Sequence, residues 1–310
     1  MRREEIILES TRKVKLPGVL WIPENEPKAI LQITHGMTEH IGRYEKLAEE
    51  LTEQGIIVAG FDLRGHGKNM LETDYASFGK NGWEGSLQDM HFFYQMLEER
   101  FPQLPHYMLG FSLGSFLLRE YLNKYREQVA GAAILGSGYC SWLILTVMRL
   151  IVRTQIKKVG FDDTTPLVQK LSFDVYNKKF APARTRSDWL CADMKQLTDY
   201  LLDPYCREDI SAGLFWQLLG SMRKTGRKKA YEHWKKDMPV LLLSGDMDAV
   251  GNFGKGVKTL QKKMKKAGLR NVQMHLYSGA RHDILHEEEN TVAEKVRKRL
   301  GEWILNDLIK

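Results

Sequence analysis

Residues 106–125 have the sequence HYMLGFSLGSFLLREYLNKY, and the order of elements within this stretch decides the fold class. The apolar run at 106–110 predicts a buried strand, and apolar residues at helical spacing over 113–125 predict a helix. A sharp strand-turn-helix connection of the form G-x-S-x-G exposes its central serine at the end of the strand. Gly110 and Gly114 remove side chains that would collide with the neighbouring strand and helix. Ser112 is therefore a candidate nucleophile, and the alternative is a structural turn in which Ser112 only caps the helix.

Strands and helices alternate on both sides of this stretch. Further strands are predicted at 29–34, 56–61, 131–135, 239–244 and 272–277. Further helices are predicted at 44–54, 85–100, 254–267 and 290–308, and a hairpin at 5–22 with Pro17-Gly18 as its turn. This alternation predicts an α/β fold with a mostly parallel, eight-stranded sheet flanked by helices on both faces. Ligands bind at the carboxyl ends of the strands in such sheets.

The alternation is interrupted after the sixth strand. We expect a core made of residues 1–139 and 216–310, with a helical cap or lid inserted at 140–215, here called the cap segment. It opens with SWLILTVMRLIVRTQIKKVG (141–160), where basic residues interrupt a run that is too short to cross a membrane. One interpretation is a lid that lines an acyl-chain pocket and makes transient contact with an anionic membrane surface. The other is a helix that only packs on the domain below.

Each of the two predicted strands after the cap segment is followed by a loop with ionisable side chains. The sequences GDMD and GARH follow these strands, at 245–248 and 279–282. A nucleophilic serine needs a histidine that accepts its proton and a carboxylate that orients the histidine. In this kind of fold the acid precedes the histidine, and both follow the serine. We therefore predict Asp248 as the acid and His282 as the general base.

Each of these two positions has an alternative close by. Asp248 is preferred to Asp246 because a residue further into the loop reaches over the sheet. His286 is expected in a turn of helix after the loop. The string HDILH (282–286) also resembles the zinc-protease motif H-E-x-x-H with aspartate in place of glutamate. That motif needs both histidines on one long helix, whereas the preceding glycine favours a loop.

The loop after the strand at 29–34 has the sequence HGMTEH (35–40). A loop of this kind at this place donates a backbone amide to an oxyanion hole. We predict the amides of Met37 and Leu113 as the two donors, with His35 and Gly36 in support. A metal site on this loop is the alternative, but its spacing is not a ligand pattern, and neither metal nor cofactor is expected.

Six segments together resemble a known family. They are HGMTEH, IGRY, DLRGHG, GFSLGS, SGDMD and SGARHDILHE, and they are similar to the monoacylglycerol lipase and lysophospholipase branch of the α/β-hydrolases, also called serine aminopeptidase hydrolases. The similarity covers nearly the whole chain. Within the cap segment only SDWLCAD (187–193) and LLDPYC (201–206) are similar to bacterial members. The resemblance implies an α/β-hydrolase fold with a triad of Ser112, Asp248 and His282, while DLRGHG is expected to form a turn that buttresses the oxyanion loop.

The predicted activity is hydrolysis of a carboxylic ester through an acyl-enzyme. A monoacylglycerol, a lysophospholipid or a similar small-molecule or lipid ester is the expected substrate. A peptidase or amidase could use the same triad, and Asp162-Asp163 is the candidate for recognising an amine. The third possibility is a hydrolase-like ligand-binding protein with slow turnover.

Charge and cysteine content bear on partners and location. The net charge is +7, with basic concentrations at 153–158 and 223–236. The second is expected to form a solvated helix face, and nucleic acid is not expected because no aromatic-interleaved basic motif accompanies it. Three cysteines without C-x-x-C spacing favour a reducing cytoplasm. The segment MRREEIILES lacks the apolar region of a signal peptide.

Overall fold

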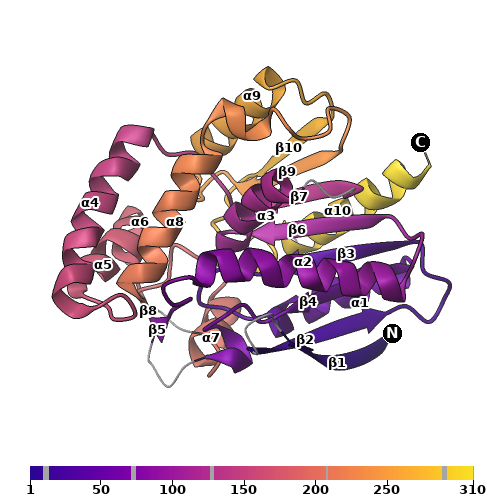
Figure 1. Ribbon diagram of the computed structural model, residues 1–310, viewed down its shortest axis with the longest axis horizontal. Coiled ribbons are helices and arrows are strands. Elements are labelled where there is room, and N and C mark those ends of the chain that lie inside the picture. Colours follow the sequence, from indigo (N-terminus) through magenta and orange to yellow (C-terminus); the bar gives the residue numbers. More distant parts are fainter. Residues whose placement is uncertain (10–13, 71–74, 126–128, 207–208, 288–291, 310) are drawn as a thin grey trace.

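The central sheet carries eight strands, and Figure 1 shows them spread among the helices, from β1 near the bottom to β10 near the top. The computed structural model describes residues 1–9, 14–70, 75–125, 129–206, 209–287 and 292–309. The spatial order of the strands is β1 (Arg2–Glu9), β2 (Lys15–Ile22), β4 (Ile56–Phe61), β3 (Ala29–Thr34), β6 (His106–Phe111), β7 (Gly131–Leu135), β9 (Val240–Gly245) and β10 (Val272–Tyr277). β2 pairs with β1 and β4 in antiparallel fashion, and all other neighbours are parallel. The predicted mostly parallel, eight-stranded sheet is confirmed.

The strands at the centre of the sheet are buried along their whole length. Every residue of β3, β4, β6, β7 and β9 is buried. Both faces of a parallel sheet are covered by helices, so its strands become continuous apolar runs instead of alternating ones. Their boundaries could be predicted to within one residue for this reason.

The hairpin was predicted in the right place but with the wrong turn. Pro17 and Gly18 lie inside β2, where they pair with Ile7 and Ile6 of β1. A Cβ at Gly18 would lie 2.8 Å from the carbonyl oxygen of Gly60, so glycine lets the strands approach closely there. The actual connection, at 10–13, falls outside the described residues.

Helices cover both faces of the sheet. α1 (Glu45–Glu53) and α10 (Glu294–Leu308) pack on one face and share an apolar cluster with it. α2 (Gly82–Arg100), α3 (Leu113–Lys124) and α9 (Lys255–Lys266) pack on the other face. The predicted start of the last helix, at 290–291, lies outside the described residues, and the described helix begins at Glu294.

The residues between β7 and β9 form a group of helices beside the carboxyl ends of the strands (Figure 1). Its elements are α4 (Trp142–Val159), α5 (Pro166–Gln169), a π-helical turn (Lys170–Asp174), α6 (Val175–Asn177), a 3-10 turn (Lys178–Phe180), α7 (Met194–Leu202), β8 (Asp209–Ile210) and α8 (Ala212–Thr225). β8 pairs with β5 (Tyr75–Ala76). α4 packs against α8, and α8 packs against α3 of the core. These contacts hold the group of helices between β7 and β9 to the core at more than one place.

The basic stretch at 223–236 does not form the single helix face that was predicted. α8 ends at Thr225, and a separate 3-10 turn follows at Lys228–Tyr231. Tyr231 and Trp234 are buried, so apolar packing bends this stretch back onto the core. Among the described helices, none is long and apolar enough to span a bilayer.

Candidate active site

Ser112 lies in the sharp turn between β6 and α3, with φ 47° and ψ −113°. A non-glycine residue adopts a positive φ only where the surrounding structure enforces it, and such strain is concentrated at functional sites. A Cβ at Gly110 would lie 2.5 Å from the carbonyl oxygen of Gly114, and one at Gly114 would lie 2.0 Å from that of Thr34. Both glycines are therefore required by the close packing of strand, turn and helix.

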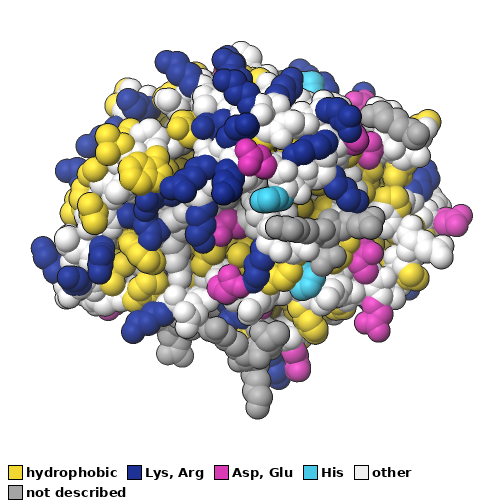
Figure 2. Space-filling model, turned by 45° about the horizontal axis from the view of Figure 1, so that its top comes forward, with side chains coloured by type: hydrophobic (Ala, Val, Ile, Leu, Met, Phe, Trp, Pro, Cys, Tyr) yellow, Lys and Arg dark blue, Asp and Glu magenta, His cyan; other side chains and the backbone are white. Residues whose placement is uncertain are grey.

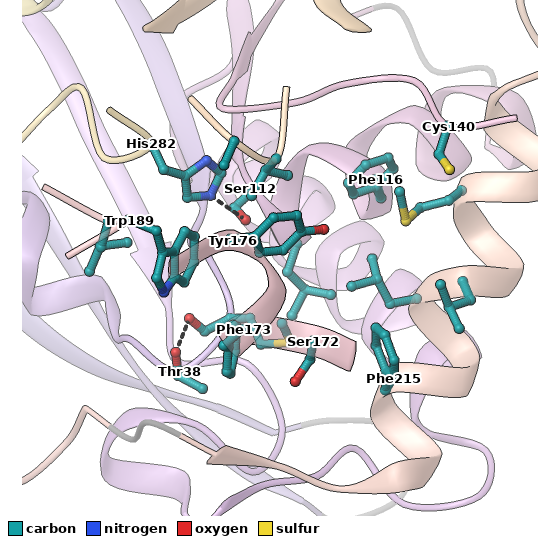
Figure 3. Close-up of a pocket in the computed structure, with 18 of the residues that line it drawn as sticks. Thr38, Ser112, Phe116, Cys140, Ser172, Phe173, Tyr176, Trp189, Phe215 and His282 are labelled. Atoms are coloured by element: carbon teal, nitrogen blue, oxygen red, sulfur yellow. Dashed lines mark hydrogen bonds between the residues drawn. The ribbon is translucent and has the colours of Figure 1, made fainter. Parts of the chain in front are cut away.

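The three predicted triad residues meet in one hydrogen-bonded chain. Nε2 of His282 lies 2.8 Å from Oγ of Ser112, a contact drawn in Figure 3, and Nδ1 lies 3.0 Å from Oδ1 of Asp248. Asp248 is fully buried, and it also accepts hydrogen bonds from the amide of Val250 at 2.8 Å and from Oγ of Ser244 at 3.2 Å. These partners fix the carboxylate that faces the imidazole.

Asp246 has a different position from Asp248. Its Oδ1 accepts a hydrogen bond from the amide of Gly279 at 2.8 Å, at the exposed side of the neighbouring turn. Asp246 therefore ties the acid-bearing loop to the histidine-bearing loop, and Asp248 alone of the two carboxylates touches His282.

Aromatic rings enclose the imidazole of His282. The ring centroids of Phe111 and Trp189 lie 5.0 Å and 5.2 Å from that of His282. Gly136 has φ 54°, and a Cβ there would lie 2.7 Å from the ring of Phe111 and 3.0 Å from Cε1 of His282. The imidazole is thus held between rigid apolar surfaces, which limit its rotation and exclude water.

His35 anchors the predicted oxyanion loop (residues 35–40) through two hydrogen bonds of its imidazole ring. Nε2 of His35 accepts a hydrogen bond from the amide of Leu63 at 2.9 Å, and its Nδ1–H donates to the carbonyl oxygen of Gly36 at 2.7 Å. Burial lowers the pKa of His35 to about 3, so the ring is neutral near pH 7. Asp62 accepts from the amide of Ile41 at 2.9 Å. The DLRGHG turn therefore contacts the oxyanion loop, as predicted.

The two predicted oxyanion donors are on the surface of a cavity. Met37 and Leu113 both line it, and Leu113 is the first residue of α3, whose amide has no acceptor within the helix. Across the described parts of the chain, neither amide has a hydrogen-bond acceptor. The helix dipole of α3 adds to the favourable field for a negative oxygen at this position.

Glu39 and Arg43 form a buried ion pair beside the oxyanion loop. Glu39 also accepts hydrogen bonds from the amide of Gly36 at 2.5 Å and from the hydroxyl of Tyr44 at 2.8 Å. Arg43 makes a second ion pair with Asp283 at 2.9 Å. Glu39 therefore stabilises the loop through these contacts, and a metal is not needed to explain its position.

His286 belongs to this network and not to the triad. Its Nδ1 lies 3.0 Å from Oδ1 of Asp283, and its Nε2 donates to the carbonyl oxygen of Arg43 at 2.8 Å. Burial alone would raise the pKa of Asp283. The charges and hydrogen bonds of His286 and Arg43 lower it by more, so the pKa of Asp283 lies well below its usual range. Residues 282–286 form a loop and turn instead of a helix, which corrects the expected position of His286 and removes the zinc-protease geometry.

The cavity beside Ser112 has a volume of about 480 Å³. Figure 3 shows Ser112 and His282 at one end, with Phe116, Cys140 and Phe215 further along. Its apolar walls come from the core and from the cap segment, and they include Phe111, Phe116, Ile144, Leu145, Met148, Phe173, Tyr176, Trp189, Phe215, Leu218 and Leu219. Such a cavity suits an alkyl chain.

Several residues at the site were not predicted. Trp189 belongs to SDWLCAD, a segment that indicates no role for it, and Tyr200 belongs to none of the predicted motifs. The hydroxyl of Tyr200 lies 2.9 Å from Oγ1 of Thr38, so α7 is bonded to the oxyanion loop. Thr38 itself has φ 64°. The contact of Trp189 with His282 and the contact of Tyr200 with Thr38 each join residues more than 90 positions apart. Neither contact therefore has a local sequence signal.

These features define a serine hydrolase built on the α/β-hydrolase fold. More narrowly, the chain belongs to the family described as serine aminopeptidase, S33, whose model matches residues 25–289. The predicted branch of the α/β-hydrolases is confirmed by this match and by the relatives.

Sequence relatives cover most of the chain. It is 26% identical over 289 residues to the monoglyceride lipase of Homo sapiens, covering 92% of this chain and 84% of that protein. It is 25% identical over 295 residues to the monoglyceride lipase homolog of Monkeypox virus, covering 92% of each chain.

Solved structures share the fold. A thermostable carboxyl esterase from Bacillus coagulans, in complex with glycerol, superposes with a TM-score of 0.90 at 22% identity over 99% of both chains. A soluble variant of the monoglyceride lipase from Saccharomyces cerevisiae, in complex with a substrate analog, superposes with a TM-score of 0.77 at 18% identity, covering 99% of this chain and 95% of that one.

Proposed function

We propose that this chain hydrolyses the carboxylic ester of a monoacylglycerol or a closely similar lipid through an acyl-enzyme at Ser112. The observation that carries the proposal is the hydrogen-bonded chain from Ser112 through His282 to Asp248, which opens on an apolar cavity. The names of the relatives, monoglyceride lipases from several organisms, support the same substrate class.

The reaction follows from the positions of the groups. Oγ of Ser112 attacks the ester carbon while Nε2 of His282 takes its proton, and Asp248 stabilises the resulting imidazolium. The amides of Met37 and Leu113 donate hydrogen bonds to the tetrahedral oxyanion. His282 then returns the proton to the leaving alcohol. In the second half, His282 takes a proton from a water molecule, whose oxygen attacks the acyl carbon. The bond from that carbon to Oγ of Ser112 then breaks, His282 gives the proton to Oγ, and the fatty acid leaves.

The charges around the cavity favour an ester over a peptide. Of its described lining residues only Glu39 is acidic, and this carboxylate is already bound by Arg43, Gly36 and Tyr44. Asp162, the earlier candidate for amine recognition, accepts a hydrogen bond from Ser77 and does not line the cavity. Among the described residues that line the cavity, a free amino terminus would therefore find no available carboxylate.

A substrate panel tests this proposal. Purified protein is assayed on 1-monoacylglycerols of increasing chain length, on lysophospholipids and on peptide amides, with a fluorophosphonate probe as a measure of serine reactivity. The proposal predicts highest kcat/KM on the monoacylglycerols and covalent labelling at Ser112. Labelling without turnover of any ester would favour a ligand-binding protein, and preference for the amides would favour a peptidase.

We further propose that α4 makes transient contact with an anionic lipid surface. Leu143, Val147 and Leu150 lie one helical turn apart and are 67%, 48% and 58% exposed. Figure 2 shows hydrophobic side chains at the left of the molecule with Lys and Arg side chains around them. An apolar helix face bordered by cations is typical of a segment that lies in a membrane interface.

Vesicle binding tests this contact. L143E/L150E should reduce binding to anionic vesicles, because it places carboxylates where apolar side chains would enter the lipid. L202E is the matched control, since Leu202 is 76% exposed but belongs to α7. Equal loss in both proteins would argue against α4 as the contact. A cytoplasmic location remains a prediction from cysteine content.

A further inference from the structure

A second hollow lies between α4, α8 and α9, beside the catalytic cavity. It has a volume of about 380 Å³, within the range of small-ligand sites. Its described lining consists of Tyr139, Cys140, Trp142, Leu145, Met222, Arg223, Gly226, Arg227 and Lys263. Tyr139, Cys140, Leu145 and Met222 also line the catalytic cavity, so the two spaces share a wall. Three of the nine residues are cationic and none is acidic.

The three cations of this hollow lack counterions. In the part of the chain that the structure describes, Arg223, Arg227 and Lys263 make no ion pair, and Nε of Arg223 is buried without a hydrogen-bond partner. Their neighbours differ, because Lys224 pairs with Glu120 and Lys228 lies near Glu232. Unpaired like charges that face one space repel each other, and a bound anion would remove this cost.

Aromatic rings hold two of these cations in place. The guanidinium carbon of Arg223 lies 5.0 Å from the ring centre of Trp142, and Nζ of Lys263 lies 4.6 Å from that of Tyr139. Cation–π contacts restrict the side chains without neutralising them. The positive field extends beyond the hollow, since the pKa of Arg149 is lowered by burial and by the charge of Arg223. Figure 2 shows Lys and Arg side chains gathered beside the hydrophobic side chains at the left.

We propose that this hollow binds a phosphate group, the chemistry shared by the head group of an anionic phospholipid and by free inorganic phosphate. Arg223 supplies the planar donors that match phosphate oxygens, and Arg227 and Lys263 supply further positive charge. The apolar side chains of Trp142 and Leu145 give the wall against which a lipid would lie. The site goes beyond the proposed hydrolysis, because it needs neither Ser112 nor turnover.

Two binding measurements test the site and separate the sources of phosphate. The first is calorimetric titration of the full chain with inorganic phosphate. The second is co-sedimentation with vesicles of phosphatidylcholine alone or mixed with phosphatidic acid. R223Q/R227Q/K263Q removes the three charges of the hollow. K228Q/K262Q/K265Q removes the same number of charges from exposed positions outside the hollow and is the matched control.

The proposal predicts that the first triple variant weakens phosphate or anionic-vesicle binding by at least about tenfold, since each interfacial cation contributes substantially. The control should weaken it by less than about twofold, because it leaves the hollow intact. Binding of inorganic phosphate would identify a free phosphate, and binding to anionic vesicles alone would identify a lipid head group. Equal loss in both triples, or no preference for anionic over neutral vesicles together with no phosphate binding, would overturn the proposal.

Folding is checked independently. Circular dichroism and the melting temperature are compared for both triple variants. Should the first triple fail to fold, R227Q and K228Q form a second matched pair, because both side chains are exposed and neither supports the core. A selective loss of anion binding in R227Q supports the site, and equal binding in the pair contradicts it.

Discussion

Trp189 of the cap segment lies against the imidazole of His282, with the two ring centroids 5.2 Å apart. The contact brings a residue between α6 and α7 to His282, the proposed general base, which is carried by the loop after β10. The main-chain amide of Trp189 is itself fixed by Oδ1 of Asn177 at 3.0 Å. The segment that carries Trp189 therefore contacts His282 itself as well as lining the cavity.

Trp189→Ala should lower kcat/KM by about tenfold to a hundredfold, because the imidazole gains freedom to leave the productive orientation. Trp189→Phe keeps an aromatic surface and should retain most of the activity. Steady-state kinetics on a soluble ester measure the effect. Melting temperatures recorded alongside separate it from a loss of stability, and activity that tracks stability alone would contradict a positioning role.

Asp248→Asn should lower kcat by about four orders of magnitude, because an amide cannot stabilise the imidazolium or hold its tautomer in the same way. Asp246→Asn is the matched change two residues away. It removes the charge of the group that accepts from the Gly279 amide but no contact with His282, so kcat should change far less. If both variants lost activity equally, the acid would be wrongly assigned.

His66 should make the protein acid-sensitive. Burial, followed by the charge of His35, lowers the pKa of His66 to about 3, against about 6.5 in an unfolded chain. Between these values the unfolded state binds a proton that the folded state does not, so the free energy of unfolding falls as pH falls from about 6.5 towards 3. His66→Gln should reduce this slope by about 1.4 kcal/mol per pH unit near pH 5, roughly one proton. Urea titrations at several pH values measure it, and an unchanged slope would contradict the lowered pKa.

Gly114→Ala should destabilise the fold by about 3 kcal/mol or more, because its Cβ would lie 2.0 Å from the main-chain oxygen of Thr34 and backbone cannot move aside cheaply. Gly79→Ala is a useful comparison. A Cβ at Gly79 would meet nothing within 4 Å, so only its positive φ of 74° is costly, by about 1 kcal/mol. Chemical denaturation of both variants checks the difference, and equal losses would contradict the packing explanation.

Much of this arrangement could be predicted from local patterns. Continuous apolar runs gave the buried strands, and the turn or loop after each of β6, β9 and β10 gave Ser112, Asp248 and His282. These patterns work because parallel strands place their carboxyl ends at one edge of the sheet. The G-x-S-x-G turn could be recognised because its glycines are demanded by contacts within a few residues, apart from that of Gly114 with Thr34.

The cap segment could not be predicted in the same way. The helices and turns between α4 and α7 are short, and one turn is π-helical, so their apolar periodicity is weak. The contacts of Trp189 with His282 and of Tyr200 with Thr38 depend on how these helices lie on the core. The turn predicted at Pro17-Gly18 was wrong because long-range pairing overrode a strong local signal. These two residues lie inside β2, which pairs with both β1 and β4.

The central claim is that Ser112 is the nucleophile, activated by His282 and Asp248. The most direct test is the turnover number of Ser112→Ala against wild type on a 1-monoacylglycerol, with folding confirmed by an unchanged melting transition. The account predicts a loss on the order of 10⁶-fold, because Oγ of Ser112 is the hydroxyl that lies within hydrogen-bond distance of Nε2 of His282. Turnover within about tenfold of wild type would contradict it and place the nucleophile elsewhere.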